Sequence, residues 1–183
     1  TKNIFPSTVF IKQAFLNICA EQQFSKGAFL QREHERAHYI YFIRKGLVGY
    51  YTSSEKGNIT YKMFFAENSF VASTAAVVSK QMSSFSIVAL EDCEVVGYSA
   101  AKFRALYQAH HDVALFHIAY LEKNWVVAKE PMEIALRTET AKERYQKLKE
   151  DLPYFNRLKM HQVASYLGVT PTQLSRIRRE IER

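Results

Sequence analysis

The side chains best suited to recognition chemistry gather near the end of the sequence. Arg176 can donate two parallel hydrogen bonds to guanine, while Thr172 and Gln173 can supply a methyl contact and an adenine contact. Neighbouring basic and polar side chains suit phosphate oxygens. The candidate DNA-binding set is Lys159, Gln162, Thr170, Thr172, Gln173, Ser175, Arg176, Arg178 and Arg179. Within this set, we assign phosphate contacts to Lys159, Gln162, Arg178 and Arg179.

Two short helical patterns within residues 157–179 must position these side chains. Apolar residues three and four apart give each pattern one buried face. These apolar residues are Val163, Ala164 and Leu167, then Leu174, Ile177 and Ile181. Gly168 suits the left-handed end of the first helix, and Thr170 and Gln173 form a capping box around Pro171. The pattern predicts a helix-turn-helix; the alternative is a helical hairpin with a solvated charged face.

The charge of the chain is concentrated in the same region. The 183 residues carry a formal net charge of +7. From Ala141 onward there are ten Lys/Arg and five Asp/Glu, a net +5, whereas the first 140 residues hold fifteen and thirteen, a net +2. A basic end on a nearly neutral body predicts that a polyanion such as double-stranded DNA binds at the C-terminal end.

No set of residues has the spacing of a catalytic or metal site. Cys19 and Cys93 are too few for an iron–sulfur cluster, which needs about four cysteine ligands. His34 and His38 lie in a strand-and-turn context, so their spacing of four does not place them on one helical face. We therefore expect neither an enzyme nor a metal cofactor. A cupin-like enzyme is the weaker rival, and metal analysis of the pure protein would test it.

Several features bear on where the protein works. No run approaches the roughly 18 apolar residues of a membrane span, and no signal peptide is evident. Two distant cysteines without metal-ligand spacing are typical of reduced thiols in a cytoplasmic protein. The sequence begins at Thr1 without Met, so we expect residues to be missing from its start.

Short aromatic and β-branched runs separated by turn signals occupy residues 24–99. This texture predicts an antiparallel sandwich or barrel. The predicted strands are Ala28–Arg32, His38–Arg44, Leu47–Thr52, Ile59–Phe65, Ser84–Leu90 and Glu94–Tyr98. Gly57 or Asn58 should take the positive φ of a hairpin loop at Ser53–Asn58. An incomplete apolar stripe predicts a helix over Ser7–Gln22 before the first strand.

A long helical pattern from His111 to about Arg137 follows a short helix at Ala100–Gln108. Its apolar seam has heptad spacing, which is typical of a helix that pairs with a copy of itself. The proposed dimer-interface residues are Ala114, Ile118, Leu121, Trp125 and Ala128, and Met132 and Ala135 continue the seam. A second face, formed by Val113, Phe116, Tyr120 and Val127, should pack on the strand domain. Pro131 predicts a kink near Val127–Glu130.

These patterns divide the chain into three parts. Residues 1–110 form the predicted sensing domain with its N-terminal helix, residues 111–138 the dimerisation helix, and residues 139–183 the helix-turn-helix domain. Thr140 and Glu143 form a capping box that starts a helix through about Glu150. The boundary between the last two parts should therefore lie near Arg137–Thr140.

This order of parts resembles the Crp/Fnr family of bacterial transcription regulators, in the style of members common in Bacteroidetes. The matching stretches are KGAFLQRE (Lys26–Glu33), YIYFIRKGLVGYY (Tyr39–Tyr51), FAENSFVAS (Phe65–Ser73), ALEDCEVVGYS (Ala89–Ser99) and QVASYLGVTPTQLSRIRR (Gln162–Arg179). The resemblance implies an α+β fold: an antiparallel β-roll of the cyclic-nucleotide-binding type, a long dimerisation helix and a C-terminal winged helix-turn-helix. We expect the wing to be reduced or lacking, because the sequence ends at Arg183.

The resemblance also identifies the positions where a cyclic nucleotide would bind. Nucleotide-binding members carry a Gly-Glu pair and an Arg-Ser or Arg-Thr pair, which here fall on Ala72-Ser73 and Ser83-Ser84. Both charged residues are absent, so neither cyclic AMP nor cyclic GMP is expected. The candidate effector pocket consists of Ala72, Ser73, Thr74, Ser83, Ser84 and Phe85. An uncharged effector and an empty pocket both remain open.

The family's DNA-reading pattern is kept only in part. Many members start the recognition helix with Arg-Glu and place an Arg four residues after the Glu; these positions hold Pro171, Thr172 and Arg176. The half-site should therefore differ from the family's best-known one. We predict a cytoplasmic homodimer on an inverted-repeat operator, with RNA polymerase kept open as a further partner. The alternative is a small-molecule sensor whose tail contacts a protein instead of DNA.

Overall fold

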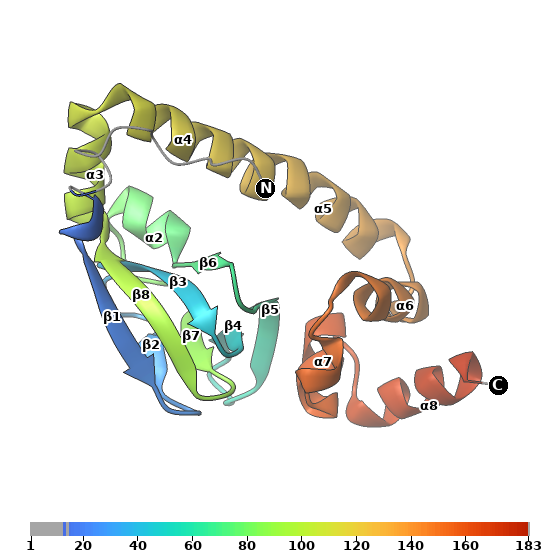
Figure 1. Cartoon of the computed structure of the whole chain (residues 1–183). Helices are drawn as coiled ribbons and strands as arrows, with labels where there is room; N and C mark the ends of the chain where they lie inside the picture. Colours follow the sequence, from blue (N-terminus) through green and yellow to red (C-terminus); the bar gives the residue numbers. More distant parts are fainter. Residues whose placement is uncertain (1–12, 14, 183) are drawn as a thin grey trace.

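Two four-stranded antiparallel sheets fill the first half of the computed structural model, which describes residue 13 and residues 15–182 (Figure 1). One sheet has the order β1-β8-β3-β6 and the other β2-β7-β4-β5. The strands are β1 Cys19–Phe24, β2 Phe29–Gln31, β3 Tyr39–Lys45, β4 Val48–Ser53, β5 Ile59–Phe65, β6 Phe70–Val71, β7 Ser86–Ala89 and β8 Cys93–Ser99. In the described residues these strands form separate sheets rather than a closed barrel, as expected for a β-roll.

All six predicted strands are confirmed. The predicted helix at Ser7–Gln22 is helical at residues 13, 15 and 16, but it ends before Cys19, so its last four residues were predicted wrongly. Residues 19–22 belong to β1, which pairs with β8 from Cys19↔Tyr98 to Phe24↔Cys93. Most of the remaining predicted helix lies outside the described residues. The pairing with β8 decides this segment's structure, because its own apolar pattern was too incomplete to fix a helix.

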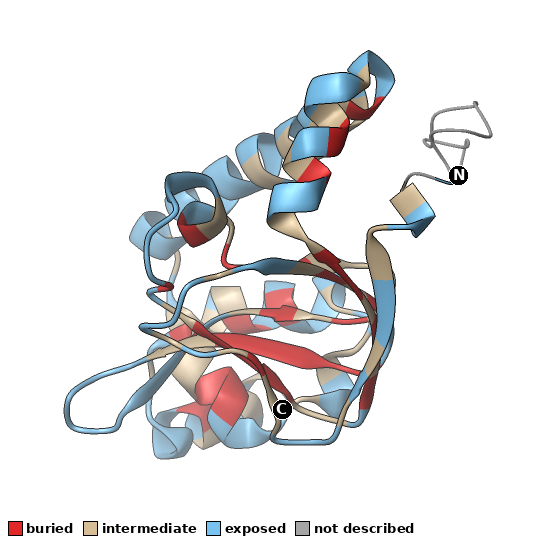
Figure 2. Ribbon diagram, turned by 90° about the vertical axis from the view of Figure 1, so that its left-hand side faces the viewer, coloured by how far each residue is buried: buried red, intermediate tan, exposed pale blue. Residues whose placement is uncertain are grey.

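The two sheets enclose an apolar core built from alternating side chains. Ile43, Val48, Ile87 and Val95 are almost completely buried at its centre, where red strands meet in Figure 2. Gly46 turns the chain between β3 and β4 at φ +105°, and a Cβ there would lie 2.6 Å from Cys93 Sγ. Only glycine fits both this conformation and this close approach.

Helices cover one end of the roll and then leave it. The helical segments are α2 Thr74–Ser79, α3 Ala100–Ala109, α4 His111–Leu121, the π-helical turn η1 Glu122–Val127 and α5 Ala128–Thr138. Phe103, Leu106 and Val113 pack with Tyr98 in a second buried cluster that joins α3 and α4 to the sheets. Figure 1 shows α4, η1 and α5 as one long rod that spans from the roll to the C-terminal helices.

The irregularity expected from Pro131 occurs one turn earlier, as η1. Pro131 lies inside α5 and has no N–H to donate to the preceding turn. A π-helical turn shifts all later side chains around the axis, because its hydrogen bonds span five residues instead of four. Val127, which we expected to face the strand domain, is consequently 68% exposed. Heptad spacing counted across η1 therefore does not predict which side chains share a face of the helix.

The C-terminal helices match the predicted helix-turn-helix closely. They are α6 Ala141–Asp151, the 3-10 turn η2 Phe155–Arg157, α7 Met160–Leu167 and α8 Pro171–Ile181. Both predicted capping boxes form, at Thr140 with Glu143 and at Thr170 with Gln173. Gly168 ends α7 at φ +70°. Residues 139–182 contain no strand, so this described part of the chain has no wing hairpin.

Candidate functional site

The outer face of α8 presents most of the predicted DNA-contacting side chains to solvent. Thr172, Gln173, Arg176 and Arg179 are exposed, while Leu174 is 1% exposed and fixes the opposite face in the core. Arg176 makes no hydrogen bond or ion pair with any described residue. A packed inner face therefore holds a row of polar side chains outward, although Arg179 Nε also donates to Ser175 O at 3.4 Å.

The N-terminus of α8 is fixed by its capping box. The Thr170 hydroxyl accepts a hydrogen bond from Gln173 N at 3.2 Å, and Gln173 Oε1 accepts one from Thr170 N at 2.8 Å. Gln173 therefore keeps only its amide N–H groups for a base, while its oxygen is committed to the cap. The cap sets the direction in which the exposed side chains leave the helix.

Gln162 does not suit the phosphate contact that we assigned to it. Its side chain is buried, and its Oε1 accepts a hydrogen bond from Lys159 N at 2.8 Å. This side chain caps the start of α7, so it is withdrawn from solvent. Lys159 itself is exposed and remains suited to a phosphate.

Arg178 and Ser175 are less available than the spacing alone indicated. Both side chains are half-buried. Arg178 lies 3.9 Å from Met160 Sδ and pairs with Glu182 at 3.7 Å. Arg178 therefore leans along the start of α7 while Arg176 and Arg179 point away from the helix pair.

Helix α7 lies against the exposed edge strand β5. The Ser165 hydroxyl donates to Ile59 O at 2.6 Å and accepts from Tyr61 N at 3.1 Å. Tyr154 Oη donates to Phe64 O at 2.9 Å further along the same strand. An edge strand offers unpaired backbone groups, and here side chains of the C-terminal part satisfy some of them. The helix-turn-helix is therefore docked on the β-roll.

One arginine reinforces this docking with two carboxylates. Arg157 makes paired hydrogen bonds to Glu67, at 2.8 and 3.0 Å, and to Glu91, at 2.6 and 3.2 Å. The Arg157 guanidinium holds the pKa of Glu67 down to about 2, and the two carboxylates raise the pKa of Arg157. Bidentate pairs of this kind are geometrically specific. We name these three residues the Arg157 clasp.

Arg157→Met should loosen the docked arrangement by about 1–2 kcal/mol, since the clasp is partly solvated. The readout is hydrogen exchange at the Tyr61 amide, which Ser165 protects. Because the pKa of Glu67 is lowered from 4.5, the stabilisation is complete above about pH 4.5 and declines as pH falls through about 2. In the parent protein the protection of this amide, measured against an unstructured peptide at the same pH, should thus fall only on acidification. Lys45→Met, which breaks an exposed pair with Glu94, is the control and should leave this exchange unchanged.

The predicted effector residues surround a hollow between β4, β5 and α2. Ser73, Thr74, Ser84 and Phe85 line this pocket, which we name the cassette pocket and whose volume is about 170 Å³. Ala72 lines a different pocket. Ser83 is 1% exposed and lines neither pocket. Sequence reasoning missed Tyr50, Lys62 and Trp125, which also line the cassette pocket. These residues come from distant segments, so no local spacing could reveal them.

Lys62 provides the positive charge of the cassette pocket. Its ammonium lies 4.7 Å from the centre of the Phe85 ring and 5.4 Å from that of Tyr50, and the two rings stack at 4.6 Å. Burial and the nearby charge of Lys129 lower the pKa of Lys62. No ion pair joins Lys62 to any carboxylate in the part of the chain that the structure describes.

The long helix places the predicted dimer residues on different faces. Ile118 is exposed and Ala128 is exposed beyond η1, but Leu121 and Trp125 line a pocket against the β-roll. The apolar side chains of α4, η1 and α5 that are at least half exposed are Leu115, Ile118, Val126, Val127, Ile134 and Leu136. We name these six residues the outer stripe, and Figure 2 shows this helix as largely exposed.

Two negative findings concern the described residues only. They contain no group of three or more His, Cys, Asp or Glu side chains placed to hold a metal ion. None of their helices combines the length and apolar character needed to cross a bilayer.

Comparisons with known proteins place this architecture. Residues 21–110 match the family described as cyclic nucleotide-binding domain. No curated protein matches the sequence. Solved structures with the same fold include the regulator CLP of Xanthomonas campestris, described as c-di-GMP responsive (13% identity over 96% of this chain and 92% of that one, TM-score 0.75). A second is FixK2 of Bradyrhizobium japonicum (19% identity over 90% of this chain and 85% of that one, TM-score 0.75). A third is a Crp/Fnr-family regulator of Eubacterium rectale (14% identity over 99% of this chain and 88% of that one, TM-score 0.74).

The residues at the nucleotide positions do not fit a cyclic nucleotide bound in the family's manner. Ser83 Oγ lies 2.8 Å from Ser73 Oγ and 2.6 Å from Phe85 O, so the two serines satisfy each other inside the protein. No carboxylate lines the cassette pocket to take ribose hydroxyls. A buried phosphate needs charged or amide partners, and the two positions that the family uses offer only hydroxyls that are already engaged.

Proposed function

We propose that this chain, which carries a cyclic nucleotide-binding domain in a fold shared with Crp/Fnr transcription regulators, is itself a sequence-specific DNA-binding regulator. It acts in the cytoplasm as a homodimer on an inverted-repeat operator. The observation that carries the proposal is α8, whose packed inner face and capped N-terminus hold Thr172, Gln173, Arg176 and Arg179 outward. The net +5 of the C-terminal part supports a polyanionic partner.

The three-part division of the chain gives each part a role in this proposal. The β-roll senses, the rod of α4, η1 and α5 joins two copies, and the docked helix-turn-helix reads one half-site. Two recognition helices of a dimer reach successive major grooves about 34 Å apart, which is why the operator should be an inverted repeat. The outer stripe is the surface that we assign to the dimer. RNA polymerase stays open as a further partner at the promoter.

Selection of bound sequences from a random DNA pool, with no ligand added, tests the proposal. Enrichment of an inverted repeat would support a dimeric reader that needs no effector. Binding without an enriched motif would point to an obligatory effector. If binding also lacked a steep salt dependence, the tail would be assigned to a protein partner instead.

Arg176→Ala should remove the preference at one base pair in each half-site, weakening operator binding by about 1–3 kcal/mol per half-site. Nonspecific binding should remain nearly intact, because Arg176 is assigned to a base edge. Arg179→Ala is the matched comparison, since an exposed phosphate contact should weaken binding to all sequences alike and reduce the salt slope by about 1. Equal losses on operator and scrambled DNA for Arg176→Ala would contradict base reading by this residue.

A further inference from the structure

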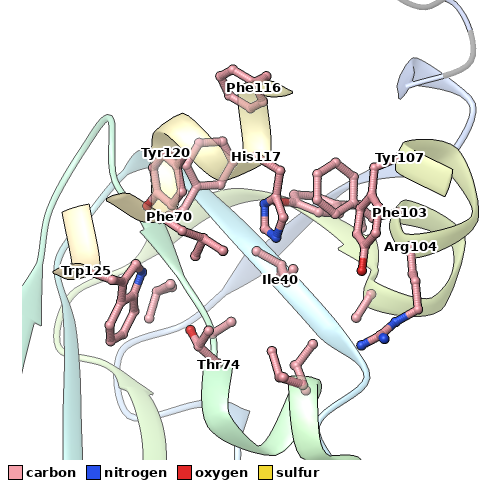
Figure 3. A pocket seen from close by; sticks show the side chains of 17 residues that line it. Ile40, Phe70, Thr74, Phe103, Arg104, Tyr107, Phe116, His117, Tyr120 and Trp125 are labelled. Carbon is pink, nitrogen blue, oxygen red and sulfur yellow. The ribbon is translucent and has the colours of Figure 1, made fainter. Parts of the chain in front are cut away.

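A second hollow lies beneath α4, apart from the cassette pocket. It is bounded by α2, α3, α4, η1 and the β-roll, and its volume is about 80 Å³. We name it the aromatic pocket, because its walls carry Phe70, Phe103, Tyr107, Tyr120 and Trp125, which Figure 3 labels, together with Tyr98. The two pockets share only Thr74 and Trp125 among their lining residues. The aromatic pocket is therefore a separate site, built mainly by the helices that follow the β-roll.

The aromatic pocket contains one permanent positive charge. Arg104 reaches into it from α3, on the side where the Tyr107 hydroxyl lies in Figure 3. Arg104 is half-buried and forms no ion pair or hydrogen bond with any residue that the structure describes. No Asp or Glu lines this pocket. A guanidinium beside an apolar hollow favours a planar anion, because it can donate two parallel hydrogen bonds to a carboxylate.

His117 adds a polar group near the middle of the pocket, where Figure 3 shows its ring nitrogens. Its ring stacks on Tyr107 at 5.4 Å and meets the edge of Phe103 at 5.1 Å. Burial lowers the pKa of His117, so the imidazole is neutral at neutral pH and can donate one hydrogen bond. The site thus offers one charge, one or two further polar groups and aromatic walls.

We infer that the aromatic pocket binds a small aromatic carboxylate, with its ring between the aromatic side chains and its carboxylate on Arg104. One water molecule needs roughly 10–15 Å³ of cavity volume on this scale, so the pocket has room for several atoms of that size. This room suits a ligand with a single ring. Offset or edge contacts with the surrounding rings would orient the ligand. This inference about binding does not depend on the proposed function of the chain.

The position of the pocket beside the rod also indicates what ligand binding would do to the protein. Leu121, the last residue of α4, and Trp125, in the middle of the π-helical turn η1, line it on the proposed dimer rod. π-helical turns are frequent at functional sites. A ligand there would contact the rod directly and stabilise one arrangement of η1. This regulatory step, unlike the binding itself, rests on the proposed function.

Benzoate is the probe, with benzamide as its uncharged counterpart. Trp125 is the only tryptophan of the chain and lines the site, so its fluorescence should report saturable binding of benzoate. Because Trp125 also borders the cassette pocket, variants must distinguish the two sites. Arg104→Gln should weaken benzoate binding at least about tenfold, as expected for loss of a charge-assisted pair. Lys62→Gln, in the cassette pocket, and Lys102→Gln, exposed on α3, should leave it unchanged.

Each other outcome counts against the proposal. No saturable change with benzoate up to about 10 mM, in both fluorescence and calorimetry, would overturn it, because single-ring ligands of a fitting site bind at millimolar levels or below. Loss of binding in Lys62→Gln, with Arg104→Gln unaffected, would move the site to the cassette pocket. Equal affinity for benzamide and benzoate would remove the role of Arg104. Thermal unfolding of each variant without ligand checks that the fold is intact, and DNA binding is a separate readout.

Discussion

Ile118→Glu should separate the proposed dimer into monomers and weaken operator binding by about a hundredfold or more, because a monomer loses the second half-site. Ile118 is 50% exposed and belongs both to the predicted heptad seam and to the outer stripe. A carboxylate in an apolar interface would be desolvated without a partner, which strongly disfavours association. Light scattering measures the mass, and titration of operator DNA measures the affinity.

The matched control is Ala101→Glu, which places the same charge on the exposed surface of α3. It should leave both mass and affinity unchanged. A charge at Trp125 is a poor test of the dimer, because Trp125 lines two pockets and its replacement would disturb the monomer. An Ile118→Glu protein with the parent mass would remove the outer stripe from the interface.

The face of the long helix shows where sequence reasoning stops. The heptad spacing of Leu121 and Trp125 with Ile118 assumed one continuous α-helix. The structure inserts η1 between α4 and α5, so the heptad spacing does not hold beyond Leu121. Within α4 itself, Leu121 lines a pocket against the roll whereas Ile118 is exposed. Pro131 signalled an irregularity nearby, but its exact place and its π-helical form depend on how Leu121 and Trp125 pack on the roll.

The helix-turn-helix could be predicted almost residue by residue because its signals are local. Thr170, Pro171 and Gly168 specify caps and a turn within a few positions, and no distant partner overrides them. Gln162 shows the limit of such reasoning: its residue type suits a phosphate, but its position three residues after Lys159 makes it a cap. Strand β1 shows the opposite case, where pairing with β8 determines the structure.

The pockets could not be predicted because their residues meet only in the fold. The cassette pocket takes Lys62 from β5 and Trp125 from η1, more than sixty residues apart in the numbering. A resemblance located Ser73 and Ser83, yet it could not show that these hydroxyls are hydrogen-bonded to each other. The absence of the family's charged pair was readable from the sequence, whereas the alternative cations Lys62 and Arg104 were not.

Leu174→Ala should abolish DNA binding while leaving the β-roll folded. Leu174 is 1% exposed at the centre of the small core formed with Val163, Ala164 and Leu167. Truncation of a buried leucine costs about 2–5 kcal/mol. At about 0.05–0.15 kcal/mol per residue, a unit of this size has only a few kcal/mol of stability, so most of it would unfold. Circular dichroism should show lost helix, and DNA titration should show lost binding.

Leu16→Ala is the matched control, because it removes the same atoms from a side chain that is 53% exposed ahead of β1, outside both the rod and the helix-turn-helix. Its helix content and DNA affinity should stay near those of the parent. The β-roll can be followed separately through hydrogen exchange of β3 and β8, which lie in the other core. Exchange there should not change in Leu174→Ala. If β3 and β8 opened together with the helix-turn-helix, the docking of α7 on β5 would make the two parts one cooperative unit, and the Arg157 clasp would contribute to the stability of the whole chain.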